Sequence, residues 1–400
     1  MTFEEKLKKI KRGVEEIVPE ADLIKKLKES EKEQKPLRIK YGIDPTGSDV
    51  HIGHLVPIRK MRDFQDLGHI GVIIIGDFTA QIGDPTGRDE SRPPLTSEQV
   101  KKNAERYMEQ LYTVLDENRT EVRWQSEWFG DMNLSSVLRI LSKFTLAQFL
   151  AHDTFRNRYE KGLPLAMHEL MYPVLQAYDS VAIEADIELG ATEQKFNILA
   201  GRDMLAYYKM EPQVAILAPI LMGTDGINKM SKSLGNYIAV FDEPKEKYGK
   251  VMSIPDKLIT NYFRYATNTP EATITEIEKQ LKDNEINPKL LKQQLARKIV
   301  KIYHGEEVSK KAEEDFNKVF SQRNIPDDMP EFTVKEPTWI VKILKESGLC
   351  KSNGEARRLI KQNAVSIDGK KLKTANLDLE VNSAKIIKVG KRRFLKVIPE

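Results

Sequence analysis

The stretch RIKYGIDPTGSDVHIGH, residues 38–54, decides how this chain can fold. Residues 38–43 are strand-like, and the Asp-Pro-Thr-Gly segment at 44–47 ends that run because Pro and Gly interrupt regular structure. A helix is then predicted from about His51 to Leu67, with Gly68 just beyond its end. The apolar run at 71–76 predicts a strand buried on both faces of a parallel sheet. Strand, helix and strand together form a βαβ unit, whose ligand binds at the carboxyl ends of the strands.

The same alternation of elements continues through the first 235 residues. Capping residues at 96–99 predict a helix, and strands are expected at 121–124 and 214–221. Further helices are expected at 134–148 and 165–178. This order predicts an α/β fold with a doubly wound, Rossmann-like parallel sheet. Apolar residues spaced three and four apart predict one amphipathic helix over 3–32, an N-terminal arm on this domain of residues 1–235.

The remaining residues change in character after about Phe241. Residues 236–325 have helical patterns and few strand-like runs, so we expect a helical domain there. Residues 326–336 are polar and proline-rich, as in a linker. Residues 337–400 predict a small α+β domain with helices near 340 and 355, and a turn at Asp368-Gly369 between short strands.

Composition and charge restrict the class of protein. Hydrophobic residues make up 40% and charged residues 31% of the chain, as in ordinary globular proteins. No run approaches the roughly 18 apolar residues of a membrane span, the first residues are rich in Lys and Glu, and Cys350 is the single cysteine. We therefore expect a cytoplasmic protein without a membrane partner. The net charge is +4, but residues 337–400 carry +9 and the others −5, which favours a polyanionic partner for the tail.

Two short motifs carry side chains that bind phosphates. His51 and His54 flank Gly53 after the first strand, where a nucleotide can approach the backbone without meeting a Cβ. Lys229 and Lys232 lie in a small, polar loop after the last apolar strand. Each motif alone would be weak evidence for a phosphate-binding site. Because both lie at the crevice of one doubly wound sheet, we expect them to converge on a single polyphosphate.

The residues of these two motifs resemble the signature motifs of a known family. His51-Ile52-Gly53-His54 and Lys229-Met230-Ser231-Lys232-Ser233 match the two signature motifs of the class I aminoacyl-tRNA synthetases. The resemblance implies that the enzyme binds ATP with Mg²⁺ and forms an aminoacyl-adenylate, with no metal ligands of its own. It implies catalytic roles for His51, His54, Lys229 and Lys232, and ATP contacts from Asp44, Thr46, His51, Gly53, His54, Gly190, Glu193, Lys229, Ser231 and Lys232.

Within that family the chain is similar to the bacterial-type tyrosyl enzymes along nearly its whole length. The segments at 40–46, 77–87 and 172–179 carry this similarity. The resemblance implies that Asp84, Tyr172 and Gln176 hold the amino group of L-tyrosine, that Asp179 accepts a hydrogen bond from its phenol, and that Tyr41 and Gln194 lie beside it. Tyr172, Gln176 and Asp179 share one helix face by their spacing. The chain departs from the pattern at Lys40, where much of the family has a tyrosine touching the phenol, and at Glu193, where the ribose contact is an aspartate.

The tail resembles an S4 RNA-binding domain. Ala356, Leu359 and Ile360 are expected in its core, with Arg357, Arg358 and Lys361 directed toward RNA. The resemblance implies tRNA(Tyr) as a partner, anticodon recognition by the helical domain, and a homodimer.

Three alternatives remain open from the sequence. A tryptophanyl-tRNA synthetase has a related core but lacks the S4-like tail. A non-catalytic RNA-binding protein derived from a synthetase would not need both ATP motifs intact. A small nucleotidyltransferase would leave the helical domain and the basic tail without a role.

Overall fold

The computed structural model describes residues 1–47, 49–82, 96–323, 329–381, 383–390 and 393–399. Contacts within the chain divide it into two compact units, residues 1–313 and residues 314–400. The division lies inside a helix, α16 (Glu306–Arg323). The sheet and the helical residues that follow it thus share one unit, and the expected domain boundary at 235 stays a prediction.

A six-stranded sheet forms the centre of the first unit. Its order is β1-β6-β5-β2-β3-β4, and every neighbouring pair is parallel except β1 with β6. The strands are β1 (Glu16–Val18), β2 (Arg38–Ile43), β3 (Ile70–Ile75), β4 (Thr120–Trp124), β5 (Ile187–Ala191) and β6 (Val214–Ala218). The chain leaves β2 toward β3 on one side and returns to β5 on the other, so β2 and β5 border the point where ligands bind in such sheets. The predicted doubly wound α/β fold is confirmed.

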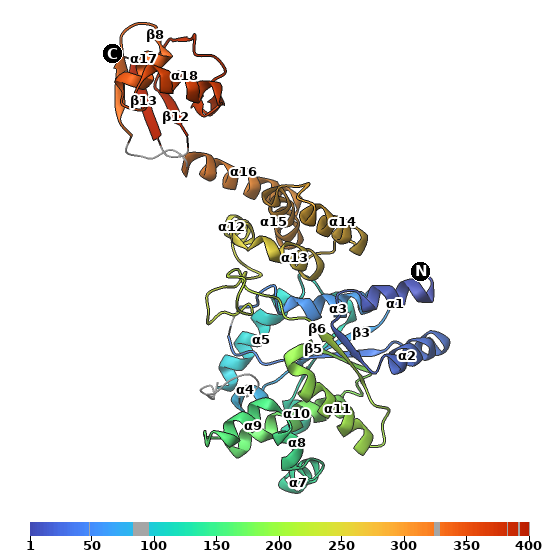
Figure 1. Ribbon diagram of the computed structural model, residues 1–400. Coiled ribbons are helices and arrows are strands. Elements are labelled where there is room, and N and C mark those ends of the chain that lie inside the picture. Colours follow the sequence, from blue (N-terminus) through green and yellow to red (C-terminus); the bar gives the residue numbers. More distant parts are fainter. Residues whose placement is uncertain (48, 83–95, 324–328, 382, 391–392, 400) are drawn as a thin grey trace. The chain divides into compact units, whose positions relative to one another are not determined.

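Helices cover both faces of this sheet, as Figure 1 shows for α3 and α10. Side chains alternate along each strand, so Ile73 packs in one core cluster with residues of α3 (Leu55–Gln65) and α5 (Ser97–Leu111). The neighbouring Val72 and Ile74 face the other side, toward Ile183. That side carries α10 (Met167–Ala182) and α11 (Lys195–Tyr207), which pack closely against each other.

The N-terminal arm differs from the single helix expected over 3–32. It consists of α1 (Phe3–Lys11), the edge strand β1, and α2 (Glu20–Glu33). Gly13 has a φ of +67°, a left-handed conformation that stops a helix, and Pro19 lacks the amide that a continuing helix needs. Between them Ile17 and Val18 pair with β6.

The remaining helices fall partly outside the predicted helical regions. Residues 79–82, 126–129 and 153–160 form short helices that the sequence patterns did not predict, and the helix expected over 134–148 is divided into two. The shorter ones around the sheet are α4 (Thr79–Ile82), α6 (Ser126–Phe129), α7 (Leu134–Leu141), α8 (Leu146–Leu150) and α9 (Asp153–Glu160). After the sheet come α12 (Pro244–Ser253), α13 (Ile259–Ala266), α14 (Glu271–Lys282), α15 (Pro288–His304) and α16. None of the helices in the described residues is both long and apolar enough to cross a membrane.

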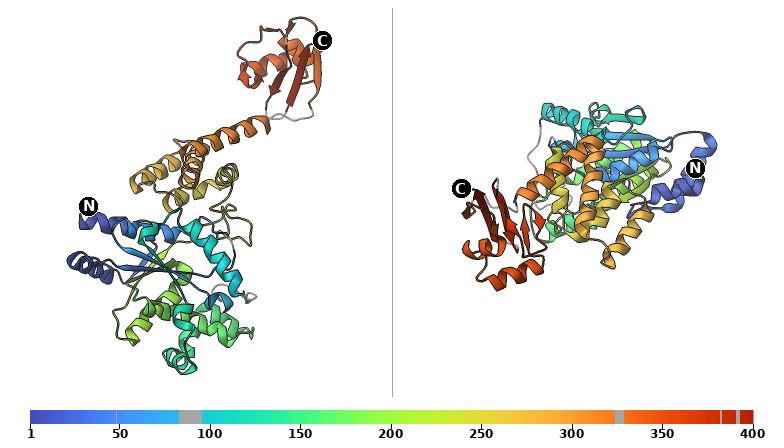
Figure 2. Two further views of the ribbon diagram at one scale, coloured as in Figure 1. Left: turned by 180° about the vertical axis from the view of Figure 1, so that it is seen from behind. Right: turned by 90° about the horizontal axis from the view of Figure 1, so that it is seen from above.

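The tail has its own sheet and core. Strands β7 (Glu331–Val334), β9 (Val365–Ile367), β10 (Lys370–Lys371), β12 (Lys385–Val389) and β13 (Arg393–Pro399) form it, and β8 (Thr338–Trp339) pairs with β11 (Asp378–Leu379). Helices α17 (Ile340–Glu346) and α18 (Asn353–Lys361) pack against the sheet, as both views in Figure 2 show. The expected helices and the turn at Asp368 are present, but β7 lies inside the segment expected to be a linker. Because prolines lie on both sides of β7, its short alternation of polar and apolar residues was not recognised as a strand.

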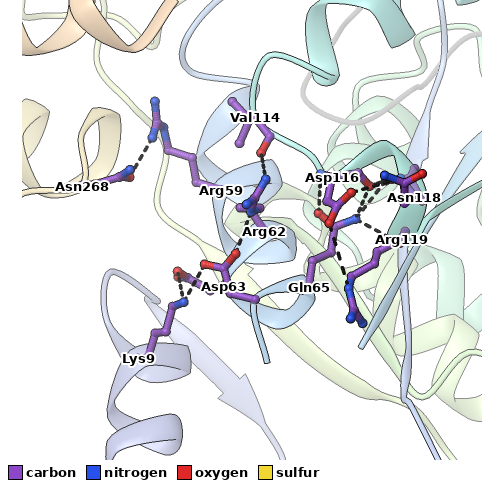
Figure 3. A network of polar contacts seen from close by, with 12 residues as sticks. Lys9, Arg59, Arg62, Asp63, Gln65, Val114, Asp116, Asn118, Arg119 and Asn268 are labelled. Atoms are coloured by element: carbon purple, nitrogen blue, oxygen red, sulfur yellow. Dashed lines mark hydrogen bonds and ion pairs between the residues drawn. The ribbon is translucent and has the colours of Figure 1, made fainter. Parts of the chain in front are cut away.

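A polar network holds α3, the helix that begins just after His54, to three other segments (Figure 3). Lys9 of α1 pairs with Asp66 at 2.7 Å, and Arg59 donates to the Asn268 side chain at 3.0 Å. The Gln65 amide donates to the carbonyl of Arg119 at 3.0 Å and accepts from the backbone N–H of Asp116 at 2.9 Å. This network fixes the orientation of α3 and hence of the residues at its start.

Replacing Gln65 with leucine tests this anchoring. Gln65 is 2% exposed, and Gln65→Leu removes the partner of a partly buried backbone amide and of a partly buried carbonyl. We expect the free energy of unfolding of the full chain to fall by about 1–3 kcal/mol. Urea unfolding followed by circular dichroism measures it, with the exposed Glu109→Leu as a control that changes it by less than about 0.5 kcal/mol. A loss no larger than the control's would mean that the network does not stabilise the unit.

Candidate active site

A pocket of about 350 Å³ opens at the carboxyl ends of the central strands. This volume is at the lower end of what small-molecule sites in proteins occupy, about 300–1,000 Å³. We call it the central pocket. Twelve of the predicted site residues line it: Tyr41, Asp44, Thr46, His54, Tyr172, Gln176, Asp179, Gly190, Glu193, Gln194, Lys229 and Lys232. The two motifs, 175 or more residues apart in the chain, therefore meet in one cavity of a single compact unit.

The histidine motif forms a turn before α3, rather than the first turn of a longer helix as expected. His54 is the N-terminal cap residue of α3 and lines the central pocket. His51 stacks on it with 3.6 Å between ring centroids, but is only 6% exposed and does not line the pocket. Burial, and then the charge of Lys232, lower the pKa of His51 to about 4. His51 is thus neutral near pH 7 and supports the His54 ring.

The structure gives Gly53 a second role beside the expected one, which stays a prediction. A Cβ at this position would lie 3.0 Å from Nδ1 of His51 and 3.2 Å from its Cε1. These contacts are tighter than ordinary van der Waals distances, so a side chain at 53 would displace the His51 ring. Gly53 and Ser231 do not line the pocket, whereas His54 and Lys232 beside them do.

The two lysines of the second motif reach different walls of the central pocket. The Lys229 ammonium lies 2.7 Å from the carboxylate of Glu193, just after β5. The Lys232 ammonium donates to the carbonyl of Asp49 at 2.7 Å, in the connection that leads from β2 to α3. Both pairs are at least partly exposed, so an anionic ligand can compete for these ammonium groups at a small free-energy cost.

Two residues that the sequence did not single out shape the lysine loop. Asn236 accepts from the backbone N–H of Ser231 at 2.8 Å and donates to the carbonyl of Lys229 at 3.1 Å. Asp225 accepts from Asn236 and from the backbone N–H of Ile227, both at 3.0 Å. These hydrogen bonds, that from Ile227 first, hold the pKa of Asp225 well below its usual range. The loop is therefore shaped by its own polar contacts.

Helix α10 presents its predicted face to the central pocket. The Tyr172 hydroxyl donates to the Asp44 carboxylate at 2.8 Å. The Gln176 amide nitrogen donates to Glu188 at 3.2 Å, so its oxygen is the atom left for a ligand. Asp179 is 2% exposed, and burial raises its pKa to about 7, against the opposing charge of Lys40. Asp84 lies outside the described residues.

Lys40 lies beneath the central pocket and does not line it. Its side chain is fully buried, and its ammonium lies 3.0 Å from Glu188, 2.8 Å from the Ser180 hydroxyl and 2.7 Å from the Gln176 carbonyl. Lys40 and Glu188 are also register partners in β2 and β5. This departure from the family pattern thus gives a buried ion pair that holds α10 on the sheet.

Other pocket residues were missed from the sequence. Thr79 and Gln125 line the central pocket, and each follows a strand, at the carboxyl end where ligands bind. Their position after β3 and β4 is the signal that could have found them. In the tail, Arg357, Arg358 and Lys361 are exposed on α18, while Ala356 and Ile360 are buried. The Arg357 guanidinium lies 5.2 Å from the centre of the Trp339 ring.

Two family models match the chain. The model of class I tRNA synthetases for tryptophan and tyrosine matches residues 32–321. The model of the tyrosine–tRNA ligase SYY-like C-terminal domain matches residues 321–397.

Full-length relatives are also similar. The tyrosine–tRNA ligase of Thermotoga maritima is 47% identical over 99% of this chain and 98% of its own. That of Moorella thermoacetica is 46% identical over 98% and 95%.

Solved structures of tyrosyl-tRNA synthetases share the fold. The Archaeoglobus fulgidus enzyme complexed with L-tyrosine has a TM-score of 0.63 and 24% identity, over 78% of this chain and all of that one. A C-terminally truncated mitochondrial enzyme from Coccidioides posadasii has a TM-score of 0.63 and 21% identity, over 79% and 92%. With both motifs in one pocket and relatives matching along the whole length, the chain belongs to the tyrosine–tRNA ligases, a family of class I aminoacyl-tRNA synthetases.

Proposed function

We propose that the central pocket binds L-tyrosine and ATP side by side and joins them. The tyrosine carboxylate attacks the α-phosphorus of ATP. The bond from that phosphorus to the oxygen bridging the α- and β-phosphates breaks, so pyrophosphate leaves and tyrosyl-adenylate remains. The observation that carries this proposal is that His54, Lys229 and Lys232 line the same cavity as Asp179. Such a step needs no covalent nucleophile, because orientation and charge stabilisation supply the rate.

Each end of the pocket has a proposed ligand. Asp179 accepts from the phenol, and the oxygen of Gln176 accepts from the ammonium, together with Asp84 and Tyr172. His54, Lys229 and Lys232 hold the phosphates, with Asp44 and Thr46 nearby. Gly190, Glu193 and Gln194 lie beside the ribose and the substrate. Glu193 and Lys229 lie 2.7 Å apart. When ATP binds, Glu193 pairs with the ribose and Lys229 with the phosphates. Mg²⁺ enters with the ATP phosphates, whose oxygens are the ligands it prefers.

The other partners are proposals of the same kind. We propose that the tail binds tRNA(Tyr) through the exposed cations of α18, and that residues 236–325 contact the anticodon side. Transfer of tyrosine to the 3′ end of tRNA follows adenylate formation. A cytoplasmic location stays a prediction from the sequence.

We also propose a homodimer, supported by exposed apolar side chains on α7 to α10. Leu134 is 72% exposed, Leu138 57%, Tyr159 64% and Met167 77%. Large side chains of this kind grouped on neighbouring helices favour a protein partner, and a second copy of the chain is the commonest one.

Pyrophosphate exchange tests the proposed roles in activation. With tyrosine, Lys232→Ala and His54→Ala should each lower kcat about 10²–10³-fold while the KM for tyrosine changes less than about threefold, because the removed groups act on the departing phosphates. The exposed Lys257→Ala is the control and should match the wild type. EDTA should abolish exchange and Mg²⁺ restore it. Exchange with tryptophan only, or a raised KM for tyrosine with unchanged kcat, would overturn these roles.

Sedimentation of a single-site variant tests the dimer. Leu138→Glu introduces a charge on the exposed apolar face of α7 and should raise the dissociation constant of the dimer roughly 30-fold or more. Leu290→Glu, at an exposed leucine of α15, is the matched control and should leave the dimer intact. A monomeric wild type, or equal behaviour of both variants, would contradict the proposal.

Salt-dependent tRNA binding tests the tail. Removing two phosphate contacts with Arg358→Ala and Lys361→Ala together should weaken binding and reduce the slope of log K against log salt by about 2. Tyrosine-dependent exchange should be unchanged. The control Lys28→Ala with Lys32→Ala removes two exposed cations from α2. If both double variants bind tRNA alike, α18 is not the RNA-binding face.

A further inference from the structure

A short segment that follows the lysine loop is bonded to the backbone of the histidine motif. Residues 238–240, which we call the bridging segment, run antiparallel to that motif. The N–H of Ile52 donates to the Ile238 carbonyl at 3.0 Å, and the N–H of Val240 donates to the Val50 carbonyl at 2.8 Å. The position of the bridging segment therefore affects both groups of proposed phosphate ligands.

A buried amine holds the end of the bridging segment. Lys247 of α12 is fully buried, and its Nζ donates to the Val240 carbonyl at 2.6 Å. The same nitrogen lies 2.7 Å from Nε2 of His304 and 4.5 Å from the centre of the Tyr303 ring. The three N–H groups of an ammonium thus have a carbonyl, a ring nitrogen and an aromatic face as partners, as burial of such a group requires.

The partners of this amine come from the end of another helix. Tyr303 and His304 are the last two residues of α15, which packs against α12 (Figure 1). Burial, and then the charge of the lysine, lower the pKa of His304, so its ring is neutral near pH 7 and can accept a hydrogen bond. The Tyr303 hydroxyl also accepts from Arg59 of α3 at 3.2 Å. The end of α15 thus contacts α3, which His54 caps, and the amine that holds the bridging segment.

Burial of the amine has a free-energy cost. It lowers the pKa of Lys247 to about 7, against the opposing charge of Asp242, and the charge of Lys250 lowers it further. Asp242 itself accepts from the backbone N–H of Ala239 at 2.7 Å and pairs with Lys250 at 2.9 Å. An apolar side chain of similar length can be buried at a lower cost, which favours a role for the amine in positioning rather than in stability.

We propose that Lys247 is a positioning residue for adenylate formation. Its amine holds the Val240 carbonyl, fixes the bridging segment, and through two backbone hydrogen bonds fixes the histidine motif relative to the lysine loop. This rests on the proposed function of the central pocket. A misplacement of about 1 Å in such a site can cost about 10²-fold in rate, so a contact outside the pocket can affect the reaction within it.

Pyrophosphate exchange by the full chain tests this role. Lys247→Met keeps most of the side-chain volume and removes the amine. Its kcat should fall roughly tenfold or more, while the KM for tyrosine changes less than about threefold, because the residues proposed to hold tyrosine lie mainly on α10. Lys26→Met is the matched control. Lys26 is a buried lysine of the same compact unit, 3% exposed, and its loss should leave kcat unchanged.

Two variants of His304 separate positioning from a merely structural role. His304→Gln places an amide oxygen near the former position of Nε2, so an acceptor for Lys247 remains, whereas His304→Leu removes that acceptor. The kcat of His304→Gln should stay within about threefold of the wild type, and that of His304→Leu should fall roughly tenfold. In both variants the KM for tyrosine should stay near that of the wild type.

Hydrogen exchange followed by mass spectrometry reports on the bridging segment directly. In Lys247→Met, peptides covering residues 49–56 and 236–242 should exchange faster than in the wild type, because they contain the amides of Ile52 and Val240 that bond the two segments. A peptide from β3 is the internal control and should exchange at the rate of the wild type.

The outcomes distinguish the proposal from the function on which it rests. An unchanged kcat or unchanged exchange of both peptides in folded Lys247→Met would overturn the proposal, as would equal losses of kcat in His304→Gln and His304→Leu. Failure of the wild type to exchange pyrophosphate with tyrosine would instead refute the proposed function. If Lys247→Met does not fold, the two His304 variants decide, because both keep the lysine.

Discussion

The buried ion pair between Lys40 and Glu188 is the interaction on which the substrate side of this molecule depends. It joins β2 to β5 at the point where the chain crosses the sheet, and the same ammonium binds the Gln176 carbonyl and the Ser180 hydroxyl of α10. Removing one partner of such a pair leaves a charge without compensation, at a cost of about 3–5 kcal/mol. The pair therefore determines where α10 lies, and α10 in turn carries the carboxylate and the amide that face the central pocket.

The phosphate side of the pocket is built in a different way. His54 caps α3, whose far end is bound to α1 and to the segment before β4 by a polar network. The lysines come from a loop shaped by Asp225 and Asn236, and their ammonium groups rest on partly exposed acceptors that ligands can replace. One wall is thus held by contacts within the fold, and the ammonium groups of the other wall can exchange their partners. This suits a reaction in which pyrophosphate must be held while it forms and then released.

The sequence predicted those features that a local pattern encodes. Strand β2 appears as a strand-like run and strands β3 and β6 as apolar runs, and the spacing of Tyr172, Gln176 and Asp179 on one helix face is confirmed. Strand β5 was missed because Glu188 and Gly190 interrupt its apolar pattern, and Glu188 is acceptable there only with Lys40 beside it. Strand β1 was hidden within a Lys/Glu periodicity typical of a helix. Trp128 and Gln125 reach Asp179 through tertiary contacts that no spacing rule describes, although position after a strand could have indicated Gln125.

The central claim is that one cavity orients tyrosine at Asp179 and the nucleotide at His54. A crystal structure of the full chain with a non-hydrolysable tyrosyl-adenylate analogue tests it most directly. We expect the phenol oxygen within hydrogen-bond distance of Asp179, the phosphate beside His54, and Lys229 released from Glu193 toward the ligand. An analogue bound with its phenol away from Asp179, or outside the central pocket, would contradict it.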